Sequence, residues 1–310
     1  MVKKAATAPD LAVNLAGIRM KNPVLVASGT FGYGPEYADV VDLNKLGGIM
    51  VKGVRAVPWD GNAPPRMVEV PGGLVNAIGL QGPGVDGFVS EYMPFLRRHD
   101  TAVIVNIWGD TIDEYAEVAG RLSDVEGIHG IEVNVSCPNI KEGGIAFGTN
   151  PVTLAALVDR VRARTTLPLL VKLPPNLPDI QEFARIAQEE GSDALSLVNT
   201  MPAMVIDPET RRPVLSNVVG GLSGPALHPV AVRLVWEAAR AVHIPIVGMG
   251  GITGVGEAVE FLVAGAAAVA VGTANFTDPT TAPRLVDELA AYLSAHGMRA
   301  VGDLVGSLKL

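Results

Sequence analysis

The chain has 310 residues, of which 48% are hydrophobic, and a formal net charge of −8. The acidic balance argues against nucleic acid and anionic membranes as partners, because both attract a positively charged surface. The single cysteine excludes an internal disulfide, an all-cysteine zinc site and an iron–sulfur cluster held by this chain alone. No apolar run approaches the roughly 20 residues of a membrane span and Met1–Leu11 lacks a secretory signal, so we expect a cytoplasmic protein.

A short hairpin is predicted first, from Leu11–Ile18 and Met20–Pro23, and strands then alternate with helices. The predicted strands are continuous apolar runs, as expected for strands covered on both faces. They span Val24–Ser28, Ile49–Lys52, Ala102–Ile107, Ile131–Val135, Leu169–Leu173, Leu195–Asn199, Ile244–Gly248 and Ala268–Val271. The predicted helices span Glu36–Leu46, Gly87–Arg98, Thr111–Ser123, Pro151–Ala163, Ile180–Glu190, Pro229–Val242, Val255–Ala264 and Ala282–His296.

This alternation predicts the fold class. Strand–helix repeats give parallel strands joined by right-handed crossovers, and eight such units suit a closed (β/α)8 TIM barrel. The alternative is an open, doubly wound sheet. No linker or change of composition divides the chain, so we expect residues 1–310 to form one domain.

Three predicted connections are too long to be simple turns, namely residues 53–85, 138–149 and 200–228. Each follows a strand, so all three belong to the face at the carboxyl ends of the strands, where TIM barrels keep their active sites. The third connection contains a predicted small hairpin at residues 204–214. Long loops on one face indicate a covered site.

Polar residues collect at the predicted strand ends on this face, and few of them are carboxylates. No set of His, Asp and Glu has a spacing that suits a metal, and the five histidines are interpreted as structural or solvated. The strand ends and the first long connection contribute Ser28, Gly29, Lys52, Asn76, Asn106, Asn134, Cys137, Lys172, Asn199, Thr200, Gly250, Gly251, Gly272 and Thr273.

Glycines follow the last two predicted strands, at Gly250-Gly251 and at Gly272-Thr273. Backbone N–H groups at glycines can approach a phosphate closely, although glycines also serve tight turns. Barrels of this class often bind phosphate after their seventh and eighth strands, which favours the phosphate interpretation. The dinucleotide fingerprint is not met, because its third glycine would fall at Thr253.

Lys52 and Lys172 end apolar strands, where an ammonium group is costly to bury without a partner. Each could reach solvent instead, but two lysines in one polar mouth suggest a bound anion or an electron-rich ring. Amides suit the C=O and N–H groups of such a ring. They are supplied by Asn76, Asn134, Asn139 and Asn199. We therefore predict a planar heterocycle next to a phosphate-bearing cofactor.

Cys137 follows the predicted strand Ile131–Val135, and Pro138 ends the strand's hydrogen-bond ladder. A lone cysteine is more often inert packing among aliphatic residues. Here the neighbours Asn134 and Asn139 are polar, which favours a reactive thiol at the carboxyl end of a strand.

These segments resemble the class 1 dihydroorotate dehydrogenases, and more narrowly the catalytic subunit of the NAD-linked class 1B type. The similarity runs from the first hairpin to the eighth strand. Its most specific pieces are Ala27–Gly32, Asn76–Gln81, Asn134–Asn139, Gly220–Pro225 and Gly248–Ile252. Thr200 stands where the family often has Ser and keeps the hydroxyl, whereas Gly82 stands where relatives commonly have Asn and gets no side-chain role.

The resemblance implies FMN as the cofactor and no metal. The implied FMN contacts are Ala27, Ser28, Lys52, Asn106, Asn134, Lys172, Val198, Gly224, Gly250, Gly251, Gly272 and Thr273. Lys172 matches the family's lysine near the flavin N1–C2=O edge, where a cation stabilises the anionic reduced flavin. The implied dihydroorotate contacts are Lys52, Asn76, Gly79, Leu80, Asn134, Asn139, Asn199 and Thr200.

The reaction implied by the resemblance is oxidation of dihydroorotate to orotate in the de novo synthesis of UMP. Cys137 would remove the C5 proton while a hydride passes from C6 to flavin N5. A thiol of ordinary pKa, about 8.5, is only a few per cent ionised at neutral pH, so turnover should rise toward alkaline pH unless the site lowers that pKa. Electrons would leave to NAD+ through a partner subunit carrying FAD and an iron–sulfur cluster, attached to a homodimer of this chain in a heterotetramer.

Other functions stay open at this point. A class 1A enzyme would be a homodimer that passes electrons to fumarate at the same site, although the loop after the second strand and the Asp207–Val214 hairpin look more like class 1B. A flavin-dependent tRNA uracil reductase would need a basic surface, which the net charge of −8 disfavours. A flavin-storing or scaffold barrel would not need the Asn and Cys residues around one pocket.

Overall fold

The computed structural model describes residues 8–135 and 144–310. Two residues of the predicted site, Cys137 and Asn139, lie outside this described part of the chain.

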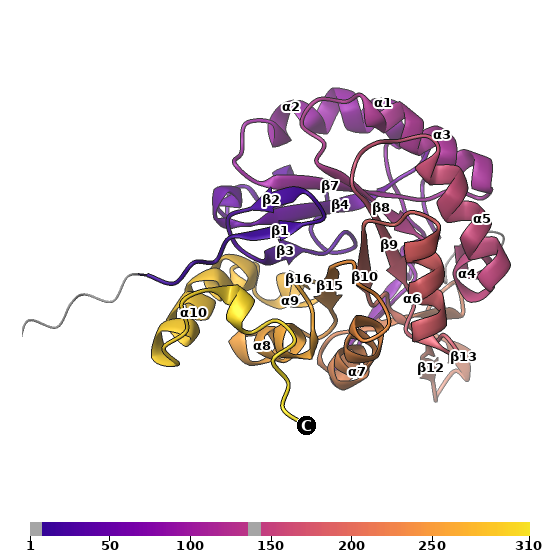
Figure 1. Ribbon diagram of the computed structural model, residues 1–310. Helices are drawn as coiled ribbons and strands as arrows, with labels where there is room; N and C mark the ends of the chain where they lie inside the picture. Colours follow the sequence, from indigo (N-terminus) through magenta and orange to yellow (C-terminus); the bar gives the residue numbers. More distant parts are fainter. Residues whose placement is uncertain (1–7, 136–143) are drawn as a thin grey trace, which may run out of the picture.

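Eight parallel strands close into a barrel, drawn in Figure 1 with helices around it. In their order around the barrel they are β3 (Val24–Val26), β4 (Gly48–Val54), β7 (Ala102–Ile107), β8 (Gly130–Asn134), β9 (Leu169–Leu173), β10 (Ala194–Leu197), β15 (Ile246–Met249) and β16 (Ala268–Val271). β16 pairs with β3, which closes the cylinder. The predicted (β/α)8 barrel is therefore confirmed, and the open sheet is wrong.

The helices that follow the barrel strands mostly match the predicted ranges. They include α3 (Ile112–Ser123), α5 (Pro151–Arg162), α6 (Ile180–Glu189), α7 (His228–Ala239), α8 (Val255–Ala264) and α10 (Thr281–Ala295), with shorter helices α4 (Gly144–Thr149) and α9 (Ala274–Thr277). Side chains cap the first turns of several helices: Thr111, Asn150 and Asp179 each accept hydrogen bonds from backbone N–H groups of the turn that follows.

The first two predicted helices need correction. The predicted helix Glu36–Leu46 is wrong: the segment forms two short 3-10 helices, Pro35–Tyr37 and Leu43–Lys45. Asp42 Oδ1 accepts a hydrogen bond from the N–H of Asn44, and this local bond caps the second 3-10 helix as a separate element. The second helix begins earlier than predicted, as α1 (Gly84–Gly87), a π-helical turn and α2 (Met93–Leu96). Pro94, which lacks a backbone donor, lies at the start of α2.

A second sheet lies at the carboxyl-end face and was not predicted. Two of the long connections supply its strands, in the antiparallel order β11 (Met201–Met204), β14 (Val219–Ser223), β6 (Gly73–Asn76) and β5 (Met67–Val70). We call it the loop sheet. Beside it, β12 (Ile206–Asp207) and β13 (Arg212–Pro213) form the predicted small hairpin.

The amino-end face is closed by the predicted first hairpin, β1 (Val13–Leu15) and β2 (Ile18–Met20). Its apolar side chains join one buried cluster with residues inside the barrel, among them Leu25, Met50 and Leu170. A larger cluster lies between strands and helices. The amino end is thus packed shut, and space for a ligand is left at the carboxyl end. Across the described ranges, no helix is both long and apolar enough to cross a bilayer.

Candidate active site

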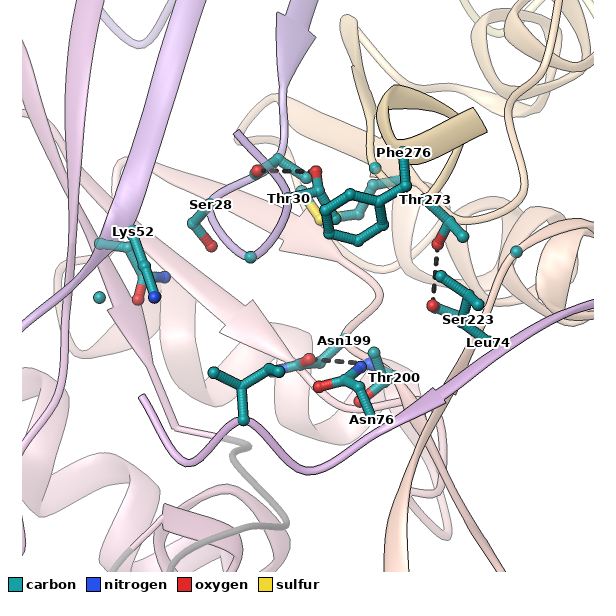
Figure 2. Close-up of a pocket in the computed structure, with 18 of the residues that line it drawn as sticks. Ser28, Thr30, Lys52, Leu74, Asn76, Asn199, Thr200, Ser223, Thr273 and Phe276 are labelled. Carbon is teal, nitrogen blue, oxygen red and sulfur yellow. Dashed lines mark hydrogen bonds between the residues drawn. The ribbon is translucent and has the colours of Figure 1, made fainter. Parts of the chain in front are cut away.

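A pocket of about 450 Å³ opens where the barrel strands end beneath the loop sheet. Figure 2 shows it with Lys52 and Ser28 on one side, Thr273 and Ser223 on the other. It brings together every described residue that the sequence predicted. They are Ala27, Ser28, Gly29, Lys52, Asn76, Gly79, Leu80, Asn106, Asn134, Lys172, Val198, Asn199, Thr200, Gly224, Gly250, Gly251, Gly272 and Thr273.

One end of the pocket is a glycine cradle. Gly224, Gly250 and Gly251 have φ angles of 102°, 133° and 71°, a region that favours glycine. A Cβ atom on Gly251 would lie 2.9 Å from the Gly224 carbonyl oxygen, so the backbone segments approach more closely than a side chain would allow. Thr273 Oγ1 donates to Ser223 Oγ over 2.8 Å at the same end. Backbone segments that approach one another closely, together with two hydroxyl groups, suit the binding of a phosphate.

His228 supports this cradle from behind. Its Nδ1 lies 3.0 Å from the Gly250 carbonyl oxygen, and its ring packs edge-on against Phe261. The interpretation of His228 as a structural histidine agrees with these contacts.

The barrel wall carries a layer of buried polar side chains. Asn106 and Lys172 line the pocket, and Lys172 Nζ lies 3.5 Å from Ser28 Oγ. Behind them lies Glu132, which is fully buried and was not predicted as a site residue. The signal was present, since Glu132 is a charged residue within an apolar strand, two positions before Asn134 and so on the same face.

The amides expected to bind substrate meet across the mouth of the barrel. Asn199 Nδ2 donates to Asn134 Oδ1 over 3.1 Å, and Asn199 Oδ1 accepts the Thr200 N–H over 2.8 Å. Asn76 arrives from the loop sheet, where its Nδ2 lies 3.4 Å from the Gly221 carbonyl oxygen. Figure 2 shows Asn76, Asn199 and Thr200 together along one side of the pocket. These contacts orient amides from two separate sheets toward one space.

Lys52 faces a mixed electrostatic environment. Burial lowers the pKa of its ammonium group below the ordinary 10.5, and the charge of Arg66 lowers it further, while Glu36 opposes the shift. Arg66 and Glu36 also line the pocket and were not predicted. Arg66 lies in the first long connection, and its guanidinium donates to Gln81 Oε1 over 2.6 Å. No strand-end pattern marks it, because the loop sheet brings it there.

Further lining residues were also not predicted. Met67, Leu74 and Ser223 come from the loop sheet, and Phe276 from α9. Phe276 points toward the pocket beside Thr30 in Figure 2. Within residues 8–135 and 144–310, no group of three or more His, Cys, Asp and Glu side chains could hold a metal ion.

The fold and the pocket together define a barrel enzyme whose site lies at the carboxyl ends of the strands. A family-wide sequence profile described as "Dihydroorotate dehydrogenase" matches residues 10–293. The chain therefore belongs to the dihydroorotate dehydrogenase family.

Individual relatives agree with this assignment. The chain is 52% identical, over 97% of its length and 99% of the relative's, to a protein of Citrifermentans bemidjiense named "Dihydroorotate dehydrogenase B (NAD(+)), catalytic subunit". It is 55% identical to a protein of the same name from Desulforudis audaxviator, over 96% of each chain. A crystal structure of DHODH from Eimeria tenella in complex with ferulenol shares the fold, with a TM-score of 0.80 and 24% identity over 99% of this chain and 91% of that chain.

Proposed function

We propose that this chain is the FMN-binding catalytic subunit of an NAD+-linked dihydroorotate dehydrogenase and oxidises dihydroorotate to orotate in the de novo synthesis of UMP. One observation carries the proposal: the described residues that the sequence assigned to cofactor and substrate line a single pocket. The relatives at 52% and 55% identity, whose names specify this enzyme, support it.

The residues present fit FMN at two points. The close backbone around Gly224 and Gly251 suits its phosphate, together with Gly250, Gly272 and Thr273. At the other end, Asn106 Oδ1 is buried and has no hydrogen-bond partner among the described residues, so it suits an N–H group of the ring. Ala27, Ser28, Lys52, Asn134, Lys172 and Val198 complete the proposed ring contacts. Bound FMN would supply the two-electron redox chemistry that side chains lack.

The proposed substrate contacts surround the adjoining space. Lys52 attracts the carboxylate of dihydroorotate, and the amides of Asn76, Asn134 and Asn199 match the ring's C=O and N–H groups. Gly79, Leu80 and Thr200 complete the described part of this set, while Asn139 lies outside the described residues.

Cys137 is proposed as the base that takes the C5 proton. It follows β8, the strand that carries Asn134. Asn134, one of the proposed substrate amides, lies at the end of β8, and Cys137 follows it three positions later in the sequence, which supports this role. A thiolate is the competent form, so its pKa governs the rate at neutral pH.

The electrons need a route out of this chain. With one cysteine, the chain cannot supply the several thiolates of an iron–sulfur cluster. A partner subunit carrying FAD and a cluster is therefore proposed, joined to a homodimer of this chain as a heterotetramer. The word "subunit" in the relatives' names supports a partner.

Residues 1–310 are proposed to form one domain. The pairing of β16 with β3, which joins the two ends of the barrel in one sheet, supports this proposal. The cytoplasmic location and the absence of nucleic-acid or membrane partners stay predictions from the sequence.

The test is purification of the chain alone and with a co-expressed electron-transfer subunit. The chain alone should carry FMN, its flavin spectrum should shift when orotate is added, and dihydroorotate should bleach it. NAD+ reduction should require the partner, whose FAD and iron–sulfur bands should co-purify. Fumarate-dependent turnover by the chain alone would instead identify a class 1A enzyme, and an orotate-insensitive flavin spectrum would contradict the dihydroorotate assignment.

A further inference from the structure

Glu132 is a charged residue in the interior of the barrel. Its side chain lies on the same face of β8 as Asn134, one layer further from the pocket, and it is 0% exposed. It is not among the residues that line the pocket. Burying a carboxylate carries a large desolvation cost unless partners compensate it, so its contacts decide what it can do.

Three other barrel strands supply those contacts. Ser196 Oγ of β10 donates to Glu132 Oε1 over 2.7 Å. Asn106 Nδ2 of β7 donates to Oε2, and Lys172 Nζ of β9 lies 3.8 Å from the same oxygen. Both carboxylate oxygens are thus engaged, and the Lys172 ammonium faces a fixed negative charge.

Two of these three partners line the pocket, namely Asn106 and Lys172. A carboxylate only accepts hydrogen bonds, so Glu132 makes Asn106 turn its Nδ2 toward the barrel interior. The other amide atom, Asn106 Oδ1, then faces away from Glu132, where it is buried and without a partner among the described residues. Glu132 therefore fixes the orientation of the Asn106 amide and leaves Oδ1 as its unused acceptor.

We propose that Glu132 is a positioning residue that tunes a bound flavin through Lys172 and Asn106. The inference rests on the proposed function, because it assumes that FMN occupies this pocket. The cation of Lys172 favours the added negative charge of a reduced flavin, and the carboxylate of Glu132 offsets part of that field. Glu132 thereby holds the midpoint potential of the flavin lower than Lys172 alone would set it, which favours onward transfer of electrons.

Glu132→Gln tests the charge with little change of shape. Its amide oxygen can still accept from Asn106, and its amide nitrogen can donate to the Ser196 hydroxyl. The midpoint potential of the bound flavin, measured by equilibration with a reference dye, should become more positive by at least about 30 mV, a tenfold change in the two-electron equilibrium. Glu132→Asp keeps the charge and should shift the potential less.

Ser196→Ala is the matched second variant, because Ser196 touches Glu132 but does not line the pocket. Losing this donor leaves the carboxylate charge less compensated, so the potential should move in the opposite direction, to more negative values. A general packing defect is not expected to shift the midpoint potential in opposite directions in two variants at neighbouring residues. If Glu132→Gln fails to fold, the direction in which Ser196→Ala shifts the potential still decides for or against the inference.

A third measurement is the affinity of apoprotein for FMN, from quenching of flavin fluorescence. It should change less than about threefold in Glu132→Gln, so that a potential shift reports on electrostatics and not on a damaged site. Unchanged or more negative potentials in Glu132→Gln, or a positive shift in Ser196→Ala, would overturn the inference. Failure of the proposed function would look different, since wild-type protein would then bind no FMN or ignore orotate.

Discussion

The two walls of the pocket are built in different ways. The barrel wall presents Asn106, Asn134 and Lys172 from adjacent strands, and all three are buried. The loop sheet presents Met67 and Asn76, which are more exposed. Among the described residues, the fully buried part of its apolar cluster is small and consists of Val75, Ala77 and Leu215. Side chains fixed by a large core are held precisely, whereas a sheet with a small core opens at lower cost.

This difference suggests a division of labour. The barrel strands carry most proposed FMN contacts, and a tightly held cofactor needs a rigid wall. The loop sheet contributes Asn76 to the proposed substrate contacts, and its strand β11 directly follows Thr200. Substitutions on the two walls should therefore separate cofactor binding from substrate binding.

The largest effect is expected for Cys137→Ala, in the segment that follows β8 in the sequence. Removing a general base costs about 10²- to 10⁴-fold in rate, so bleaching of the flavin by dihydroorotate should slow by that factor while FMN stays bound. Stopped-flow absorbance measures it. Cys137→Ser should retain part of the rate at alkaline pH, and near-wild-type bleaching by Cys137→Ala would rule out the assignment.

On the barrel wall, Thr273→Asp should weaken FMN binding strongly. A carboxylate at the proposed phosphate cradle repels the phosphate by about 2–4 kcal/mol, which corresponds to a loss of roughly 30- to 800-fold in affinity. Riboflavin, which has no phosphate, is the matched ligand: its affinity should change little. Equal losses for both ligands, measured by fluorescence quenching, would place the phosphate elsewhere.

On the loop sheet, Gly221→Ala should weaken orotate binding and spare FMN. The added Cβ would lie 1.9 Å from Thr200 Oγ1, so Thr200 must move. Overpacking of this kind costs about 1–3 kcal/mol, or roughly 5- to 150-fold in orotate affinity from the flavin spectral shift. Gly256→Ala, in α8 where a Cβ meets nothing within 4 Å, is the control. Loss of FMN from Gly221→Ala would break the proposed division between the walls.

The smallest effect concerns the pH dependence through Lys52. Burial first, and then Arg66, hold the pKa of Lys52 below 10.5. Lys52 carries its full charge below this lowered pKa and loses the charge as the pH rises through that value. Orotate affinity should therefore fall by roughly tenfold over this pH range, which is the contribution of one charged hydrogen bond. Spectral titrations across alkaline pH measure it, and Lys52→Gln should remove the dependence.

The same shift has a stability counterpart of opposite sign. Because the pKa of Lys52 is lower in the folded than in the unfolded chain, its charge destabilises the ligand-free fold at neutral pH. That contribution disappears as pH rises between the two pKa values. A loss of stability in this interval that Lys52→Gln abolishes would contradict the direction of the shift.

The sequence by itself determined the barrel and its strand-end residues. Apolar runs of strand length alternating with amphipathic helices leave few arrangements other than parallel strands, and the carboxyl ends of such strands meet on one face. Residues such as Asn106, Lys172 and Gly250 could therefore be assigned to one site before any coordinates were known. Their shared feature is local: each lies at or just beyond the end of a predicted strand.

Tertiary structure alone decided the rest. Asn76 meets Gly221 across 145 positions of sequence, and no local pattern specifies that pairing of β6 with β14. The residues that the loop sheet brings in, such as Arg66, were missed for this reason. Glu132 was missed because its meaning depends on Asn106, Lys172 and Ser196 from three other strands. A buried charge is visible in the sequence, but its partners are set by the register of the closed barrel.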